Sequence, residues 1–382
     1  MLSLPTLWLT EGYWRFVFIA FEVLLIVSLY YLCVKREQTT VNLPTGNRFK
    51  ALVDYFFVFA SIILIFMNFY ETPELFKVFF AIVVSSFLPG YALLTLISFK
   101  HGHSRIETVI LSYVISLVAT GFISAFLLQI DETQRALAVS FVYLIFSVLP
   151  LVRKLLFKTK TTLDTKLKTL KQIHLTEIIL LLIIVAFILF SVSINFPRRS
   201  YDLGEDINRH YVWSVIITRT PDHYTAPYPL FHLHEGIVQI LSEASIPVFQ
   251  TAFSFMTLVV VLSFYIMSKI YLKDVDSRLP IISTVMWAMF SGFGWLYFAA
   301  SKVFSAISDT GLSQWELLNS AYGGTYFDVG SGQGSLWLSY RPITAGFTIF
   351  FSLLYLLKRR DLSKRVFVAV FSLLVIGAGL IY

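Results

Sequence analysis

The sequence predicts an all-α integral membrane protein with about ten transmembrane helices and two long extracytoplasmic loops that contain short interfacial helices. Hydrophobic residues make up 57% of the chain and charged residues only 14%, whereas a soluble domain carries about 25% charge. The 37 Phe and 20 Tyr residues suit a lipid-facing surface with interfacial anchors. The single cysteine, Cys33, lies inside a predicted span, which excludes an intramolecular disulfide and a thiolate metal site.

Apolar runs long enough to cross a bilayer, or nearly so, follow one another along the chain. They cover residues 14–34, 51–70, 77–98, 107–129, 136–152, 177–195, 250–272, 281–300, 342–358 and 366–382. Most of the 30 Lys and Arg residues gather in alternate loops between these runs. Because cytoplasmic loops are enriched in Lys and Arg, we expect the N-terminus and both long loops to lie outside the plasma membrane. The same loops explain the net charge of +7, so nucleic acid is not an expected partner.

The charge pattern also divides the chain into regions. Residues 1–152 form a predicted N-terminal five-helix membrane region, residues 153–176 a basic cytoplasmic linker, and residues 177–382 a second membrane region. The second region carries both long outer loops, at 196–249 and 301–341. Long polar loops on a single face favour chemistry there. The sequence has no internal repeat, which argues against a transporter built from inverted halves.

The outer loop at 196–249 carries the main candidate site. Asp202, Asp206 and His210 are spaced four residues apart, so on a helix they share one face, which Trp213 continues. On that face Asp206 could deprotonate an acceptor hydroxyl as a general base, or hold a divalent cation together with Glu205. Asp202 and Glu205 also fit a capping box, in which Asp202 caps the helix.

Four of the seven histidines lie in the same loop: His210, His223, His232 and His234. His223 follows Asp222 in a segment that could be only a solvated turn. His232 and His234 open a predicted amphipathic interfacial helix, where we expect His234 at the water level and His232 lining the site. His-x-His has no third ligand at a fixed spacing, so the zinc signal is weak.

Cationic side chains at the outer ends of predicted spans are phosphate candidates. Arg341 lies at the mouth of a span, against the charge bias, where it could bind a lipid phosphate or anchor to headgroups. Arg198 and Lys302 are weaker candidates of the same kind. The glycine-rich segment 330–335 could form a backbone nest for phosphate, although a flexible loop is the simpler interpretation.

Two short motifs in the second region resemble a known family. They are Gly204-Glu205-Asp206-x-x-x-His210 and Tyr228-Pro229-Leu230-Phe231-His232. Together they resemble the first extracytoplasmic loop of GT-C superfamily glycosyltransferases, which use polyprenyl-phosphate-linked sugars. The resemblance implies that Asp206 is the catalytic base or a metal ligand, with Glu205 and Asp202 as neighbours, and that the mouth at Arg341 holds the donor phosphate. Separately, residues 87–94 resemble a segment of uncharacterised prokaryotic, often archaeal, membrane proteins.

The motifs and the resemblance together predict a membrane glycosyltransferase of the cell envelope. It would take a lipid-linked sugar from the membrane and pass the sugar to a glycan, lipid or protein acceptor, with Mg²⁺ or Mn²⁺ as the candidate cofactor. Trp213, Tyr228 and Trp337 would stack on the sugar. His210 would orient Asp206.

Three other functions stay open. The first is a transporter or flippase of a lipid-linked glycan, which would need ionisable residues at mid-span depth, where the sequence carries few. The second is a non-catalytic membrane scaffold whose loops bind a partner. The third is a metal-dependent hydrolase that uses the loop histidines.

Overall fold

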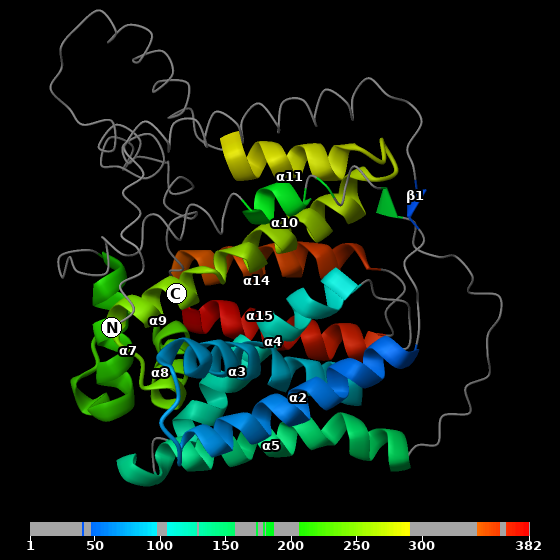
Figure 1. The fold of residues 1–382 in the computed structure, drawn as a ribbon. Helices are drawn as coiled ribbons and strands as arrows, with labels where there is room; N and C mark the ends of the chain where they lie inside the picture. The colour runs from blue at the N-terminus through cyan, green and yellow to red at the C-terminus, as the bar shows by residue number, and fades with distance from the viewer. Residues whose placement is uncertain are drawn as a thin grey trace, which may run out of the picture.

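The computed structural model describes residues 40–41, 47–97, 105–127, 130–156, 173–174, 179, 181–186, 206–290, 342–359 and 364–381. Over these residues the protein is helical apart from one pair of two-residue strands, so the all-α prediction is confirmed. Figure 1 shows the long helices with roughly parallel axes. The elements are β1 (Thr40–Val41), α2 (Asn47–Met67), α3 (Glu74–Leu96), α4 (Arg105–Leu127), α5 (Glu132–Leu156), β2 (Ile173–His174), α7 (Asp206–Arg219), the 3₁₀ helix η1 (Pro221–His223), α8 (Pro229–Ser242), α9 (Ile246–Ser254), α10 (Thr257–Leu272), α11 (Leu279–Phe290), α14 (Pro342–Lys358) and α15 (Lys364–Ile381).

Three helices are long and apolar enough to cross a membrane. The stretches that qualify are Glu74–Leu96 in α3, Ile106–Ser124 in α4 and Gln134–Arg153 in α5. Shorter apolar stretches occur in α2, α10, α14 and α15. The predicted span 14–34, most of 177–195 and residues 291–300 lie outside the described residues, so the predicted number of spans stays a prediction.

The apolar run at 250–272 forms two helices rather than the single predicted span. α9 ends at Ser254 and α10 begins at Thr257. Between them the Phe255 N–H donates to the Ala252 carbonyl at 3.3 Å and the Met256 N–H to the Phe253 carbonyl at 3.0 Å. These i→i−3 bonds tighten the turn. Hydropathy could not reveal the break, because the residues at the turn are as apolar as their neighbours.

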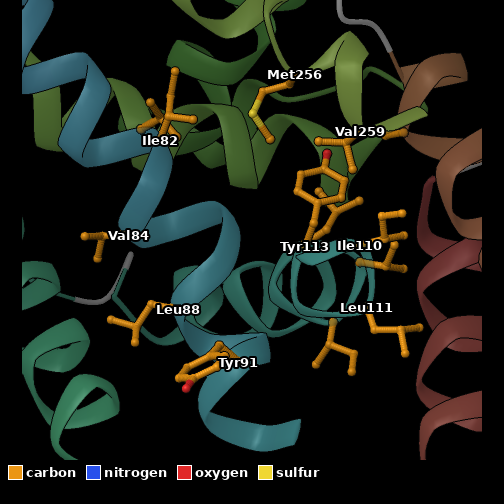
Figure 2. Close-up of a cluster of buried hydrophobic side chains, with 14 of the residues drawn as sticks. Ile82, Val84, Leu88, Tyr91, Ile110, Leu111, Tyr113, Met256 and Val259 are labelled. Carbon is orange, nitrogen blue, oxygen red and sulfur yellow. The ribbon is translucent and has the colours of Figure 1, made fainter. Parts of the chain in front are cut away.

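The core is built around the close contact of α3 with α4. A Cβ atom on Gly90 of α3 would lie 1.9 Å from the carbonyl oxygen of Ser112 on α4, so only glycine fits this crossing. The Gly90 N–H follows Pro89 and donates to the Ser116 hydroxyl at 2.7 Å. Figure 2 shows the apolar side chains that flank the crossing, including Ile82, Leu88 and Tyr91 of α3, Ile110 and Tyr113 of α4, and Met256 and Val259 beside them.

One end of the helical bundle is covered by α7, α8 and α9, as Figure 1 shows at its left. Two polar contacts tie this region to the start of α3. Lys77 lies 3.5 Å from the Glu243 carboxylate, and Ser245 donates both its N–H and its hydroxyl to Glu74, at 3.0 and 2.5 Å. The acidic loop before α3 and the end of the 196–249 loop therefore lie at the same end of the molecule.

The opposite end joins loops that the sequence assigns to the cytoplasmic face. β1 and β2 pair antiparallel, with Thr40 opposite His174, so the first basic loop meets the 153–176 linker. Arg359, after α14, lies 3.4 Å from Glu107 at the start of α4. These four segments, all expected inside the cell, therefore gather at one end (Figure 1), while the direction in which the protein crosses a membrane stays a prediction.

Candidate active site

The candidate site lies where α7 and α8 pack side by side with their first turns together. α8 begins with Pro229 at its first helical position, where the missing N–H costs nothing. On α8, a Cβ at Gly236 would lie 2.3 Å from the Thr218 side chain and 2.8 Å from the Ser214 carbonyl of α7. The glycine therefore lets the two helices approach closely, and this approach brings His210 and His232 together.

Two histidines and a tyrosine form a hydrogen-bonded chain at this contact. Nδ1 of His210 on α7 lies 2.9 Å from Nε2 of His232 on α8. Nδ1 of His232 lies 2.6 Å from the phenol oxygen of Tyr224, in the loop after η1. His210 and His232 are buried, and Tyr224 is half-buried. We call these residues the His–His–Tyr chain.

The protons of this chain have one assignment that suits each partner. The phenol oxygen of Tyr224 accepts a hydrogen bond from the Tyr228 backbone N–H, and burial raises the pKa of Tyr224, so the phenol keeps its proton. Its O–H then donates to Nδ1 of His232, and the neutral ring of His232 carries its own proton on Nε2. That proton points at Nδ1 of His210. Burial, and then the nearby His210, hold the pKa of His232 at about 3, so the ring is neutral near pH 7.

Aromatic rings surround the His–His–Tyr chain. The His210 ring lies edge-on to Tyr228 and to Phe231, both at 5.8 Å between centroids. Trp213 packs edge-on to Tyr224 at 5.9 Å. The structure therefore brings together four residues that the sequence singled out: His210, Trp213, Tyr228 and His232. A partly exposed aromatic wall beside polar groups is suited to binding a sugar ring.

Asp206, the predicted base, is the first residue of α7, one helical turn before His210. The Asp206 backbone is described and its side chain lies outside the described part of the structure. The other predicted site residues lie outside the described residues altogether: Asp202, Glu205, Arg198, Lys302, Trp337 and Arg341. Asp222 and His223 lie exposed in η1, as in a solvated turn.

The prediction that α8 is an interfacial helix with His234 at the water level is wrong. His234 is fully buried, and its Nε2 lies 3.0 Å from the Ser86 hydroxyl of α3. α8 packs against α3, α4 and α7 at once, so the face that carries His234 lies inside the bundle. The prediction assumed that the polar residues of α8 face water, whereas His232 and His234 form hydrogen bonds with side chains outside α8. With 14 residues, or about 21 Å, α8 is also too short to cross a bilayer.

Glu235 is a buried acid three residues after His232 on α8. Only 1% of the residue is exposed, and its Oε2 atom has no hydrogen-bond partner among the described residues. Burial raises the pKa of the Glu235 carboxyl to about 8, although a hydrogen bond with Ser214 lowers it. The carboxyl is therefore mostly protonated near pH 7. Ser214 also accepts the Gln239 amide N–H at 2.5 Å. A path of hydrogen-bonded side chains therefore runs from the buried Glu235 through Ser214 to the part-buried Gln239.

The described residues do not form a metal site. No group of three His, Cys, Asp or Glu side chains with metal-binding geometry occurs among them. The ring nitrogens of His210 and His232 are 2.9 Å apart, whereas a tetrahedral ion bonded to both at about 2.0–2.1 Å would hold them about 3.3 Å apart. The predicted Mg²⁺ or Mn²⁺ site at Asp206 and Glu205 involves side chains outside the described part, and it stays a prediction.

Sequence reasoning missed several residues of this region. Tyr224 was not singled out, because its contact with His232 depends on how the loop after η1 folds back. Ser86 lies 148 positions before His234 in the chain, so no local pattern connects them. Glu235 gave a signal that could have been used: it is a carboxylate within an apolar run, next to a histidine.

Comparison of the chain with protein-family models, with curated proteins and with solved structures finds no match. The function is therefore argued from the residues of the site and from the pattern of the sequence.

Proposed function

We propose that this protein is a membrane glycosyltransferase that moves a sugar from a polyprenyl-phosphate-linked donor to an acceptor hydroxyl on the extracytoplasmic face. The observation that supports the proposal best is the position of Asp206. This acid opens α7 one turn before His210, whose ring is hydrogen-bonded to His232 at 2.9 Å. The first residue of α7 is thus an acid, and the same helix carries part of the His–His–Tyr chain and of the aromatic wall.

In the proposed reaction Asp206 acts as the general base. Its carboxylate takes the proton of the acceptor hydroxyl while the hydroxyl oxygen attacks the anomeric carbon of the sugar. The bond between that carbon and the phosphate oxygen breaks, and the polyprenyl phosphate leaves as an anion. His210 orients Asp206, and the His–His–Tyr chain, whose hydrogen bonds run from the Tyr224 hydroxyl through His232 towards His210, holds the His210 ring in place. The proton on Asp206 passes to solvent when the product leaves. Glu205 and Asp202 orient Asp206 or bind the cation.

Other residues hold the substrates in this proposal. Trp213 and Tyr228, whose rings border the His–His–Tyr chain, stack on the sugar, together with Trp337. Arg341 stabilises the negative charge that develops on the leaving phosphate, with Arg198 or Lys302 as helpers. The donor enters sideways from the membrane, which the apolar helices make accessible. The acceptor is a glycan, a lipid or a protein.

The test is mass spectrometry of the lipids that co-purify with the detergent-extracted protein, for wild type, Asp206→Asn and Asp222→Asn. Asp222 is the matched control because it is an exposed acid of the same loop. We expect glycosylated polyprenyl phosphate to accumulate with Asp206→Asn only, because loss of a general base slows transfer about a hundredfold or more. Bulk phospholipid alone in all three preparations would overturn the proposal. A second preparation with EDTA tests the cation.

A proton-coupled transporter or flippase is the second candidate, because the structure buries more ionisable groups than the sequence suggested. Asp54 of α2 is fully buried and accepts the Tyr91 hydroxyl at 2.5 Å, and Glu235 is buried between helices. Buried acids of this kind are common in proton pathways. Uptake of a lipid-linked glycan into vesicles that stops with Glu235→Gln and continues with Asp206→Asn would favour this function over transfer.

A further inference from the structure

A cavity of about 350 Å³ lies between α5, α7 and α8, along α7 from Tyr211 to Arg219. Its lining includes Arg135, Tyr211, Thr218, Arg219, Gln239 and Glu243. A water molecule takes about 30 Å³ of liquid, so the cavity has room for roughly ten waters or one small headgroup. The cavity is too small for a glycan of several sugars.

The wall of the cavity is more cationic than anionic. Two arginines, Arg135 of α5 and Arg219 of α7, face one carboxylate, Glu243. That carboxylate lies 3.5 Å from the ammonium group of Lys77. The wall and this neighbour together carry three positive charges against one negative charge. The amide nitrogen of Gln239 already donates to the Ser214 hydroxyl and to the Tyr211 carbonyl, so the attraction for an anion comes from the positive charges.

Arg135 is held in a fixed position at the cavity. Only 8% of the residue is exposed. Its guanidinium donates to the Ile130 carbonyl through Nε at 3.3 Å and Nη2 at 2.9 Å, and to the Thr218 carbonyl through Nη1. Because the Thr218 carbonyl belongs to the last turn of α7, this contact fixes the end of α7 on α5. An immobilised guanidinium brings a fixed positive charge to the polar cavity, which favours binding of phosphate oxygens there.

We propose that this cavity binds a phosphate group, carried by a lipid headgroup or by free phosphate, between Arg135 and Arg219. The site goes beyond the proposed transfer reaction and does not depend on it. Asp206 and Arg219 stand at opposite ends of α7, which has 14 residues, so about 20 Å separates them along the helix. That distance is longer than one phosphosugar, and the cavity is therefore separate from the phosphate of the proposed donor.

The experiment measures binding of three probes to the full chain in detergent: farnesyl phosphate, farnesol and inorganic phosphate. Arg219→Gln is the main variant, because Arg219 is exposed and its loss should leave the fold intact. Lys273→Gln is the matched control, since it removes one exposed positive charge after α10, at the far end of the bundle. Arg135→Lys is the second variant, which keeps the charge and loses the planar guanidinium that donates to Ile130 and Thr218.

We expect farnesyl phosphate to bind, farnesol to bind weakly or not at all, and Arg219→Gln to weaken phosphate binding about tenfold or more. Lys273→Gln should bind like wild type, and Arg135→Lys should fall between wild type and Arg219→Gln. Binding of inorganic phosphate with the same dependence on Arg219 supports the site and assigns it to a free anion. Binding of farnesyl phosphate alone supports it and assigns it to a lipid. Equal binding of farnesol and farnesyl phosphate, or equal affinities for Arg219→Gln and Lys273→Gln, would overturn the proposal.

Discussion

The Nδ1 atom of His210 lies 2.9 Å from the Nε2 atom of His232, although 22 positions separate the two residues in the chain. This contact joins the start of the second turn of α7 to the first turn of α8. It depends on Gly236, which lets the two helices approach further along, and it is extended by the Tyr224 hydroxyl at 2.6 Å from His232. The packing of two short helices thus creates a directed chain of three proton carriers.

Removing the Tyr224 hydroxyl should allow His232 to adopt either neutral tautomer. We expect ¹⁵N NMR of histidine-labelled protein to show His232 protonated on Nε2 and unprotonated on Nδ1 in the wild type. With Tyr224→Phe, Nδ1 loses its donor, so His232 should become a mixture of both tautomers. Loss of one such hydrogen bond should also lower the free energy of unfolding by about 1 kcal/mol.

Tyr271→Phe is the control for this change. It removes a hydroxyl that donates to the Leu354 carbonyl at 3.2 Å, between α10 and α14. We expect a similar loss of unfolding free energy and an unchanged histidine spectrum. A His232 tautomer that is the same with and without the Tyr224 hydroxyl would show that the phenol does not direct the chain.

The stability of the protein should fall as the pH rises through the neutral range, because of Glu235. Burial raises the pKa of this carboxyl from an ordinary 4.5 to about 8. Between these two values the folded protein holds a proton that the unfolded chain gives up, so each step upward in pH favours unfolding. The loss is on the order of 5 kcal/mol over the whole window. It is absent below about pH 4.5 and complete above about pH 8.

The two buried histidines act in the opposite direction at lower pH. Burial lowers the pKa values of His232 and His234 from 6.5 to about 3. Their contribution is fully present above pH 6.5 and is lost as the pH falls toward 3. Below pH 6.5 the stability lost through the two histidines as the pH falls exceeds the stability gained through Glu235, so the free energy of unfolding should be greatest near pH 6.5.

Thermal unfolding in detergent across this pH range checks both limbs. Glu235→Gln keeps the shape of the side chain and removes the charge. It should therefore abolish the fall in stability above pH 6.5 (the alkaline limb) and leave the fall in stability below pH 6.5 (the acidic limb) unchanged. Glu71→Gln, which changes an exposed acid before α3, should leave the wild-type profile. An alkaline limb that persists in Glu235→Gln would show that another group causes it.

The helices themselves could be predicted from the sequence because their signal is local. α3, α4 and α5 begin and end within a few residues of the apolar runs at 77–98, 107–129 and 136–152. Bilayer-length hydrophobicity needs no knowledge of neighbours. The break between α9 and α10 carries no such signal, and it was missed.

The candidate site could be predicted only in part, for a related reason. The spacing of Asp206, His210 and Trp213 is a property of one helix, and α7 begins at Asp206. The partners of His232 and His234 come from the loop after η1 and from α3, and such contacts follow from packing. The error over His234 has the same origin, because hydropathy treats a histidine as a surface residue even when a serine of another helix satisfies it.

Replacing Gly90 by alanine should severely destabilise the bundle. The new Cβ would lie 1.9 Å from the Ser112 carbonyl oxygen and 2.8 Å from the Ser116 backbone nitrogen, both on α4. Neither backbone atom can move without shifting the helix. Because α3 and α4 form the most extensive helix pair of the described structure, we expect a loss of about 3 kcal/mol or more of unfolding free energy.

Gly379→Ala provides the matched control for this crossing. Gly379 lies in α15, where an added Cβ would meet nothing within 4 Å. Alanine is the better helix former by about 1 kcal/mol, so this variant should be as stable as wild type or slightly more stable. Thermal unfolding in the same detergent compares the two variants directly. If Gly90→Ala unfolds at the same temperature as Gly379→Ala, then α3 and α4 do not approach each other as closely as the structure indicates, and the burial of Ser86 against His234 would have to be reconsidered with them.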